Sequence, residues 1–443
     1  MNKFVYKNKL TSYQIIILGF SCVIMMGTLL LMLPISCGEG VNTSFLDALF
    51  TSTSAVCVTG LVLYDTASHW SLFGQFVIML LIQVGGMGVI TVAASFAMIS
   101  GRRISLMQRS TMQEALSAPK VGGIVRLTNF IIKVTLLAEL TGAAVMAPIF
   151  CRDFGSRGLW MALFHSVSAF CNAGFDLMGA KQAFSSLTAY ADEPIINLTI
   201  MILIIVGGAG FLTWDDMRIN KLHVHRYRMQ SKVILYTTAV LLSLSAIYFY
   251  FWEFASLAPG RRILSSLFQS VTPRTAGFNT VDLNDMSEAG QSVVIVLMLI
   301  GGSPGSTAGG MKTTTMAVLF AAAASAFFRK EDTQLFGRRI HDKVIKNAAT
   351  ILLMYLILFF LGGLVISIIE KLPMLTCLFE TASAIGTVGL TLGITPNLSI
   401  ISRLILILLM FFGRVGGLTL IFATLSGTQR QAARLPQETI TVG

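Results

Sequence analysis

Hydrophobic positions along the chain form long apolar runs that alternate with shorter ones. A hydrocarbon core roughly 30 Å thick takes about 20 helical residues, and eight runs are long enough to cross it. They lie at residues 12–34, 72–99, 124–150, 195–214, 231–256, 291–328, 347–369 and 400–425. Between the two members of each pair lies a run too short to span, at 47–55, 159–169, 263–272 and 373–384. The pattern predicts an all-α polytopic membrane protein.

Each short run contains a Leu-Phe pair and leads into an extended segment that ends in glycine. The phenylalanines are Phe50, Phe164, Phe268 and Phe379, and glycine follows them after 10, 10, 9 and 10 residues. These glycines, Gly60, Gly174, Gly277 and Gly389, are 114, 103 and 112 residues apart. Such regularity indicates an internal repeat. We expect four parallel units of span, half-helix, extended segment and span, at 1–100, 101–220, 221–330 and 331–443, the last including a C-terminal tail.

Composition and charge agree with a membrane location. With 54% hydrophobic and 12% charged residues, the apolar content exceeds what one soluble core can hold. Acidic residues gather around the half-helices, whereas basic ones gather at the N-terminus and between units. The basic residues are Lys3, Lys7, Lys9; Arg102, Arg103, Arg109, Lys120; Lys221, Arg226, Arg228, Lys232; Arg329, Lys330, Arg338, Arg339, Lys343 and Lys346. The positive-inside rule then places both termini and these loops in the cytoplasm.

The same rule accounts for the net charge of +11, so nucleic acid is not an expected partner. A basic loop could in addition dock a cytoplasmic protein or anionic membrane lipid. The first span is too long for a cleaved signal peptide. The six cysteines are expected to pack as small apolar residues, and a disulfide between Cys37 and Cys151 is left open.

The repeated extended segments point to ion conduction. Irregular backbone at membrane depth is tolerated only where it is buried in protein or lines water. Its carbonyl oxygens can replace the hydration shell of a monovalent cation, and glycine permits the positive-φ geometry that turns them inward. One such segment alone would be an ordinary glycine-capped turn. Four of them around one axis predict a ring of oxygens, which the half-helix C-termini and an acidic outer entrance make attractive to cations.

Four strings make a family resemblance clear, at 48–50 with 58–61, at 168–175, at 272–279 and at 387–390. The third, Thr-Pro-Arg-Thr-Ala-Gly-Phe-Asn, is the most specific. Together they resemble the Ktr-type membrane subunit of the Ktr/Trk/HKT superfamily of potassium transporters, over essentially the whole chain. The resemblance implies M1-pore helix-M2 repeats with pseudo-fourfold symmetry around one ion pore in the plasma membrane. K⁺ is the implied transported ion, and a dependence on Na⁺ is left open.

The resemblance also implies which residues form the selectivity filter. They are Cys57, Val58, Thr59 and Gly60; Cys171, Asn172, Ala173 and Gly174; Thr275, Ala276 and Gly277; and Gly386, Thr387, Val388 and Gly389. All four filter glycines are present here, as in potassium-selective members of the family. Relatives with serine at the first of these positions tend to pass sodium.

A second repeated feature lies 24 to 33 residues after each filter glycine. Small-residue clusters occur at 85–88, 207–210, 301–305 and 413–417. Such clusters usually let helices pack closely. The third cluster also contains Pro304 and further glycines, which predicts a break of the span within 301–315. That loop would lie below the filter and could close the pore, and the resemblance implies that it is the gate.

The predicted gating residues combine this loop with one deep arginine. They are Gly302, Ser303, Pro304, Gly305, Ser306, Thr307, Gly309, Gly310, Lys312 and Arg414. A central arginine costs roughly 2.5 to 3.5 kcal/mol on insertion scales, so Arg414 should face protein or water. It could pair for structural reasons, whereas the resemblance implies that it projects into the pore under the filter. Lys312 could position the loop or extend to the cytoplasm.

Two more charged residues lie in or near spans. Glu139 is expected to pair with a basic residue rather than to bind ions. Arg274, beside the third glycine-ended segment, is expected to hold pore-helix and filter backbone, since a free cation there would repel potassium.

Other classes of protein fit less well. A secondary transporter of another fold would show inverted repeats and ionisable residues at mid-membrane, and an enzyme would need a catalytic cluster that the spans lack. The pair His223 and His225 is not expected to bind metal. Because the chain has no nucleotide-binding fingerprint, nucleotide control would come from another chain. The resemblance implies a cytosolic nucleotide-binding RCK-type ring that meets the loops at 102–120 and 221–232, and a homodimer that uses the C-terminal residues 435–443.

Overall fold

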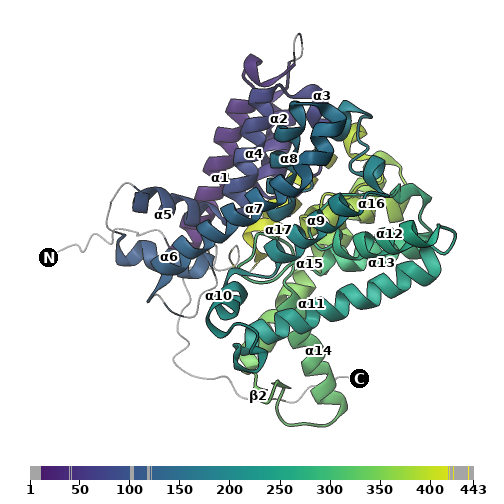
Figure 1. The fold of residues 1–443 in the computed structure, drawn as a ribbon. Helices are drawn as coiled ribbons and strands as arrows, with labels where there is room; N and C mark the ends of the chain where they lie inside the picture. The colour runs from purple at the N-terminus through teal and green to yellow at the C-terminus, as the bar shows by residue number, and fades with distance from the viewer. Residues whose placement is uncertain are drawn as a thin grey trace.

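The computed structural model describes residues 11–38, 40, 42–99, 104–116, 120, 122–417, 419, 423 and 438. Across these residues the fold is helical, with one two-stranded hairpin (Figure 1). Lys3, Lys7 and Lys9, the loop residues Arg102 and Arg103, and the C-terminal segment 435–443 apart from Glu438 lie outside the described residues.

The first half of the chain forms two similar units joined by one connecting helix. The first unit contains α1 (Ser12–Leu31), α2 (Phe45–Val56), α3 (Thr66–His69), α4 (Leu72–Met87) and α5 (Val89–Ile99). The connecting helix is α6 (Leu106–Ala115), and the second unit contains α7 (Ile124–Phe154), α8 (Arg157–Phe170), α9 (Pro194–Gly208) and α10 (Phe211–Asn220). Hydroxyl side chains fix several helix starts, because Thr11, Ser44 and Ser71 each accept a hydrogen bond from a first-turn backbone N–H.

The second half repeats this order. The third unit contains α11 (Met229–Tyr248), which continues as a π-helical turn at Phe249–Glu253, then α12 (Pro259–Val271), α13 (Glu288–Leu299) and α14 (Thr313–Phe327). An antiparallel hairpin of β1 (Gln334–Leu335) and β2 (Arg338–Arg339) leads to the fourth unit, α15 (Asp342–Glu370), α16 (Met374–Gly386) and α17 (Ile400–Val415). Short 3-10 turns lie at Pro34–Ser36, Met178–Ala180, Thr188–Tyr190, Val224–Arg226, Leu283–Asp285 and Thr395–Asn397.

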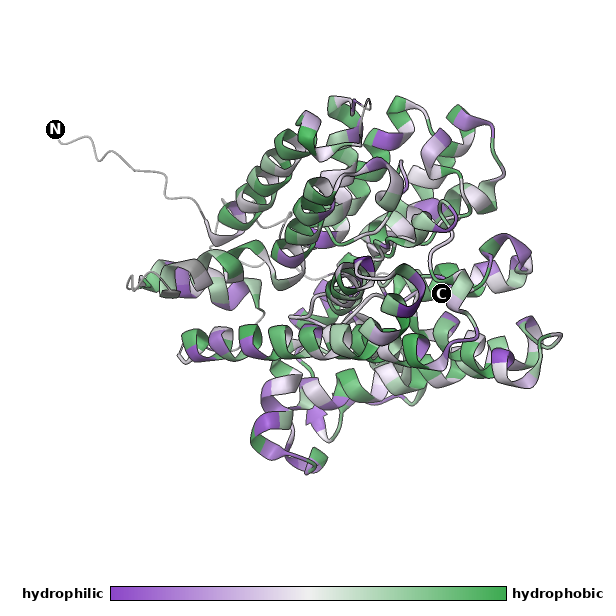
Figure 2. Ribbon diagram, turned by 45° about the horizontal axis from the view of Figure 1, so that its top comes forward, coloured by the Kyte–Doolittle hydropathy of each residue, from purple (hydrophilic) through white to green (hydrophobic). Residues whose placement is uncertain are grey.

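Four helices of the described chain are long and apolar enough to cross a membrane, and six spans result if each bent pair counts as one. The four are α1, α7, α11 with its π-helical turn, and α15. Figure 2 shows that apolar residues predominate along the helices and that polar residues are concentrated in other segments of the chain. Leu137 and Leu408, each 67% exposed, present apolar surface suited to lipid. In contrast, the four phenylalanines of the Leu-Phe pairs are at most 1% exposed.

The spans predicted at 72–99 and 195–214 are not straight helices. The chain bends by 98° between α4 and α5, and by 94° between α9 and α10. The expected run 400–425 is interrupted as well, because α17 ends at Val415 and Gly416 is not helical. The residue after the break is glycine with almost the same backbone angles each time, φ 86°, ψ 130° at Gly88, φ 90°, ψ 136° at Gly210 and φ 86°, ψ 134° at Gly416. Glycine reaches this region without a steric penalty and so ends the helix.

The glycines that open these clusters do pack closely, as small residues in spans usually do. In the clusters at 85–88, 207–210 and 413–417, an ideal Cβ on the first glycine would meet a backbone oxygen at the end of the short helix of the same unit. The distances are 2.0 Å from Gly85 to Val56 O, 2.0 Å from Gly207 to Phe170 O and 2.2 Å from Gly413 to Ile385 O. In these three clusters the first glycine permits close helix packing, and a later glycine breaks the helix.

The units contact one another in cyclic order. The helix that follows each glycine-ended segment packs on the short helix of the next unit. The pairs are α4 with α8, α9 with α12, α13 with α16, and α17 with α2. The last pair joins the end of the described chain to its beginning, so the four short helices surround a common centre.

Candidate functional site

The four glycine-ended segments meet at the centre of the molecule. An ideal Cβ on Gly60 would lie 2.4 Å from Ala173 O, and one on Gly174 would lie 2.7 Å from Ala276 O. The same construction on Gly277 reaches Val388 O at 2.2 Å, and on Gly389 it reaches Thr59 O at 2.2 Å. Each glycine thus faces the carbonyl of the residue before the next glycine, and the order closes after four steps. The structure brings the filter residues predicted from the sequence into one ring.

The backbone of each segment follows one pattern. Positive φ occurs at the glycine and again two residues before it. The angles are 58° and 91° at Val58 and Gly60, 59° and 69° at Asn172 and Gly174, 72° and 83° at Thr275 and Gly277, and 51° and 94° at Thr387 and Gly389. Left-handed geometry is strained for Val58 and Thr275, and such strain persists only where the surrounding structure enforces it. The matching angles mean that four unlike sequences present their carbonyls in one way.

Hydroxyl residues in the short helices hold these segments. The N–H of the residue before each glycine donates to the carbonyl of Ser54, Ser168, Thr272 or Ser383, at 2.8, 2.7, 3.0 and 2.8 Å. The hydroxyls of Ser54 and Ser383 also accept from the N–H of Gly60 and Gly389, at 3.1 and 3.0 Å. Those of Ser168 and Thr272 instead donate to the carbonyls of Phe175 and Phe278. The sequence analysis missed these four residues as part of the site, although a hydroxyl stands five or six positions before every glycine.

The short helices end at the ring. Helix α2 ends at Val56, α8 at Phe170, α12 at Val271 and α16 at Gly386, each within three to six residues of its filter glycine. The partial negative charge at a helix C-terminus is therefore directed four times toward the same centre. Carbonyl oxygens and helix ends both favour a cation there.

The glycine-rich loop lies against the ring on the side of the helix breaks. Helix α13 ends at Leu299 and α14 begins at Thr313, and the intervening loop bonds to two other units. Ser303 N and Thr307 N donate to the carbonyls of Gly208 and Gly207, at 3.1 and 3.3 Å, and Gly310 N donates to Gly413 O at 3.1 Å. A Cβ on Gly309 would lie 2.1 Å from Thr387 Oγ1. The loop therefore connects the helix breaks of the second and fourth units and touches Thr387, which the sequence predicts to be a filter residue.

Arg414 lies beside this loop, in the last turn of α17. Its guanidinium donates to Thr307 O in the loop and to Gly85 O and Gly86 O of α4, the last at 3.0 Å. The structure shows the expected pairing to backbone carbonyls, and one of these carbonyls, Thr307 O, belongs to the loop. Arg414 also lines a cavity of about 280 Å³ together with Lys312 and the break glycines Gly88 and Gly416.

Lys312 bonds within the loop. Its Nζ donates to Ala308 O at 2.8 Å and to Gly309 O at 3.2 Å. The side chain therefore folds back onto the loop instead of extending to the aqueous phase.

The other two charged residues have neutral partners. Glu139 accepts a hydrogen bond from Gln83 Nε2 at 3.2 Å. No ion pair to Glu139 exists among the described residues, so the prediction of a basic partner is wrong. An amide can satisfy a carboxyl group in an apolar environment without bringing in a second charge. Arg274 extends toward α11, where Nη2 donates to Thr238 Oγ1 at 3.3 Å. All six cysteines, Cys37 and Cys151 included, are free.

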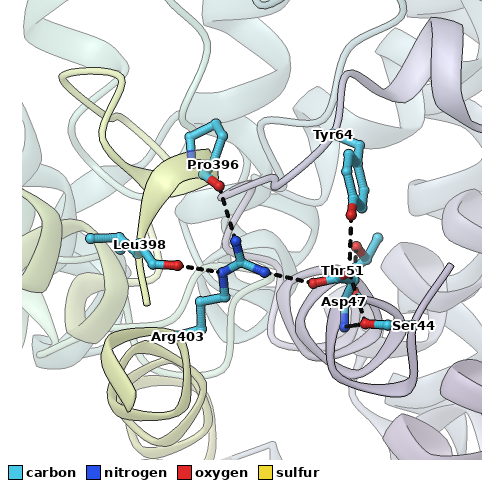
Figure 3. A network of polar contacts seen from close by, with 7 residues as sticks. All are labelled: Ser44, Asp47, Thr51, Tyr64, Pro396, Leu398 and Arg403. Atoms are coloured by element: carbon cyan, nitrogen blue, oxygen red, sulfur yellow. Dashed lines mark hydrogen bonds and ion pairs between the residues drawn. The ribbon is translucent and has the colours of Figure 1, made fainter. Parts of the chain in front are cut away.

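One ion pair joins the first and last units (Figure 3). Arg403 Nη1 of α17 lies 2.7 Å from Asp47 Oδ1 of α2. Asp47 Oδ2 also accepts from Tyr64 Oη at 2.9 Å and Ser44 Oγ at 2.8 Å, and the remaining Arg403 nitrogens donate to Leu398 O and Pro396 O. The two side chains are only 20% and 11% exposed. This network links the first and fourth units, whose residues are 356 positions apart in the sequence.

We expect Arg403→Gln to lower the free energy of unfolding by about 2 kcal/mol, because it removes charge-assisted hydrogen bonds from a mostly buried carboxylate. Asp47→Asn should cost a similar amount, and the double variant should cost less than the sum. Denaturation in detergent measures all three. The matched control is Arg152→Gln, whose pair with Asp153 has the arginine 65% exposed and should contribute little. Additive losses in the double variant would show that the two residues act separately.

Known proteins of one family resemble this chain in sequence and in fold. The family model described as TrkH, cation transport protein, matches residues 6–428. The chain is 40% identical to the potassium/sodium uptake protein NtpJ of Enterococcus hirae, over 99% of this chain and 98% of that protein. It is 37% identical to the Ktr system potassium uptake protein B of Bacillus subtilis, over 98% and 97%. The crystal structure of the potassium transporter TrkH from Vibrio parahaemolyticus shares the fold, with a TM-score of 0.74 and 20% identity over 95% of this chain and 86% of that one.

The chain is therefore a multi-pass membrane transporter and not an enzyme. It belongs to the TrkH family of cation transport proteins, and its similarity to Ktr-system proteins confirms the resemblance seen in the sequence.

Proposed function

We propose that this protein takes up potassium across the plasma membrane through the ring of glycine-ended segments. The observation that carries the proposal is the closed order of glycines and carbonyls, each glycine facing the oxygen that precedes the next one. Carbonyls in such an arrangement can replace the water around a dehydrated K⁺ ion. The four units then act as pseudo-fourfold repeats around one pathway, with 57–60, 171–174, 275–277 and 386–389 as the selectivity filter. The names of the two relatives, which mention potassium and potassium/sodium uptake, support the choice of ion.

The glycine-rich loop serves as the gate in this proposal. Its contacts to Gly207, Gly208 and Gly413 fix it against two units, and Arg414 ties it to a third. A cation leaving the ring would meet the loop and the positive charge of Arg414, which opposes its passage. Displacement of the loop would open the pathway.

Regulation would come from a second protein. The basic residues Arg226, Arg228 and Lys232 near the start of α11 suit a cytosolic nucleotide-binding subunit of the RCK type, with both termini of this chain in the cytoplasm. One relative is named as part of a Ktr system, which supports a partner subunit. We propose a homodimer as the assembled form.

Uptake by liposomes that contain the purified protein tests the proposal. Potassium should enter down its gradient, rubidium should compete strongly, and sodium should compete weakly, because the carbonyl ring distinguishes ions by their dehydration and fit. Repeating the assay with and without sodium distinguishes channel-like flux from sodium-coupled flux. Uptake that requires a proton gradient and shows no preference among the alkali ions would instead support a proton-coupled secondary transporter.

A further inference from the structure

A basic cavity lies where the start of α7 meets α10 and the residue before α11. Its volume is about 650 Å³. Among the described residues, the cavity is lined by four cationic side chains, those of Lys120, Arg126, Arg218 and Arg228, and by one carboxylate, that of Asp215. A cavity this size admits a small charged group rather than a single ion.

The charges in this cavity do not cancel. Arg228 holds both nearby carboxylates, with Nη2 3.0 Å from Asp215 Oδ2 and Nε 3.3 Å from Asp216 Oδ1. Within the described part of the chain, four cations against these two carboxylates leave an excess of two positive charges. Lys120, Arg126 and Arg218 form no ion pair within the described part of the chain. The excess charge is therefore free to attract an anion.

Two further features fit the cavity to an anion. The guanidinium of Arg218 lies 4.8 Å from the centre of the Phe130 ring, a cation–π contact that restrains it. The N-cap residue of α7 is Gly123. Because glycine has no side chain, it cannot accept a hydrogen bond from the backbone N–H groups of the first turn. The first backbone N–H groups of a 31-residue helix thus adjoin the cavity and favour negative charge.

The surroundings of the cavity place it at a membrane surface. Helix α7 is long and apolar enough to cross the bilayer, and the cavity lies at its first turn. Helix α10 is bent by 94° from α9, so it runs along the surface when α9 crosses the membrane. Met217 and Ile219, which flank Arg218, are 49% and 63% exposed. Exposed apolar side chains beside unpaired arginines match a molecule that carries both a phosphate and acyl chains.

We propose that this cavity binds the headgroup phosphate of an anionic phospholipid, held by Arg126, Arg218 and the start of α7. A soluble phosphate would use the same basic groups but gain nothing from Met217 and Ile219. A protein partner would need a larger surface than the cavity offers.

Native mass spectrometry of the full-length protein in detergent, titrated with phosphatidylglycerol or phosphatidylcholine, tests this site. The wild type should prefer phosphatidylglycerol for one site per chain by about tenfold, equal to about 1.4 kcal/mol. The variant Arg126→Gln with Arg218→Gln should lose this preference. The control, Lys343→Gln with Lys346→Gln, removes the same charge from exposed residues at the start of α15 and should keep it. Equal unfolding temperatures in lipid-free detergent verify that both variants fold.

Three results would overturn the proposal. Equal loss in the control variant would mean that lipid binds through diffuse charge. Displacement of phosphatidylglycerol by an equal concentration of inorganic phosphate would identify a soluble-anion site. Unchanged lipid preference, with loss of binding to the cytosolic partner subunit, would identify a protein-docking surface. The readout does not depend on transport, so a failure here leaves the proposed potassium pathway untouched.

Discussion

Gly277→Ser is expected to lower the preference of uptake for potassium over sodium by about tenfold, equivalent to about 1.4 kcal/mol in relative binding. The new Cβ would lie 2.2 Å from Val388 O, a distance that forces the fourth segment to move. The φ of 83° at Gly277 adds a cost of roughly 1–2 kcal/mol for any side chain. One oxygen of the ring is thereby displaced, and the field that a dehydrated potassium ion meets becomes uneven.

Competition by sodium and rubidium during potassium uptake into liposomes measures this change. Gly260→Ser is the matched control, because Gly260 lies in the same unit on an exposed turn of α12 with no atom within 4 Å of an ideal Cβ. It should behave as wild type. Gly60→Ser should act like Gly277→Ser, since its Cβ would meet Ala173 O at 2.4 Å. If both ring variants keep the wild-type ion profile, selectivity does not reside in the ring.

Arg414→Gln is expected to raise potassium flux about tenfold when the proposed regulatory subunit is absent. The substitution removes hydrogen bonds from a charged group to Thr307, Gly85 and Gly86, each of which contributes about 1.5–3 kcal/mol. A fraction of that energy suffices to shift a closed loop tenfold toward the open position. Loss of the positive charge acts in the same direction.

Arg414→Lys separates these two causes. It keeps the charge but cannot reach several carbonyls with one planar group. If both variants show high flux, the hydrogen bonds of Arg414 keep the loop closed. If only the Arg414→Gln variant shows high flux, its positive charge does. Shortening the loop within 302–310 should raise flux as well. A fall in flux in all three variants, with folding intact, would mean that the loop supports the pathway instead of closing it.

Some elements of this fold can be located from the sequence, and others cannot. The short helices and glycine-ended segments could be located from sequence because each repeats a local signal, a Leu-Phe pair followed by glycine. The breaks at Gly88, Gly210 and Gly416 could not, since a glycine in an apolar run is compatible with either a packed helix or a broken one. Only contacts with neighbouring helices decide between these outcomes.

Contacts between residues far apart in the sequence could not be predicted either. Glu139 meets Gln83, and Asp47 meets Arg403 at the other end of the chain. Neither pairing follows from local spacing, because the partners lie 56 and 356 residues apart. The hydroxyls of Ser54, Ser168, Thr272 and Ser383 did carry a local signal, their fixed position before the glycines, and it was overlooked.

The sequence by itself determined the membrane setting, the fourfold recurrence of the glycine-ended segments and the family. Hydropathy and short motifs are properties of consecutive residues, so they can be read without the structure. The tertiary structure alone decided that the second helices bend, that the ring closes in cyclic order and that Arg414 holds the loop to α4. These features depend on the distance between backbone atoms of different units. Such distances are set by the packing of the whole molecule, which no single stretch of sequence contains.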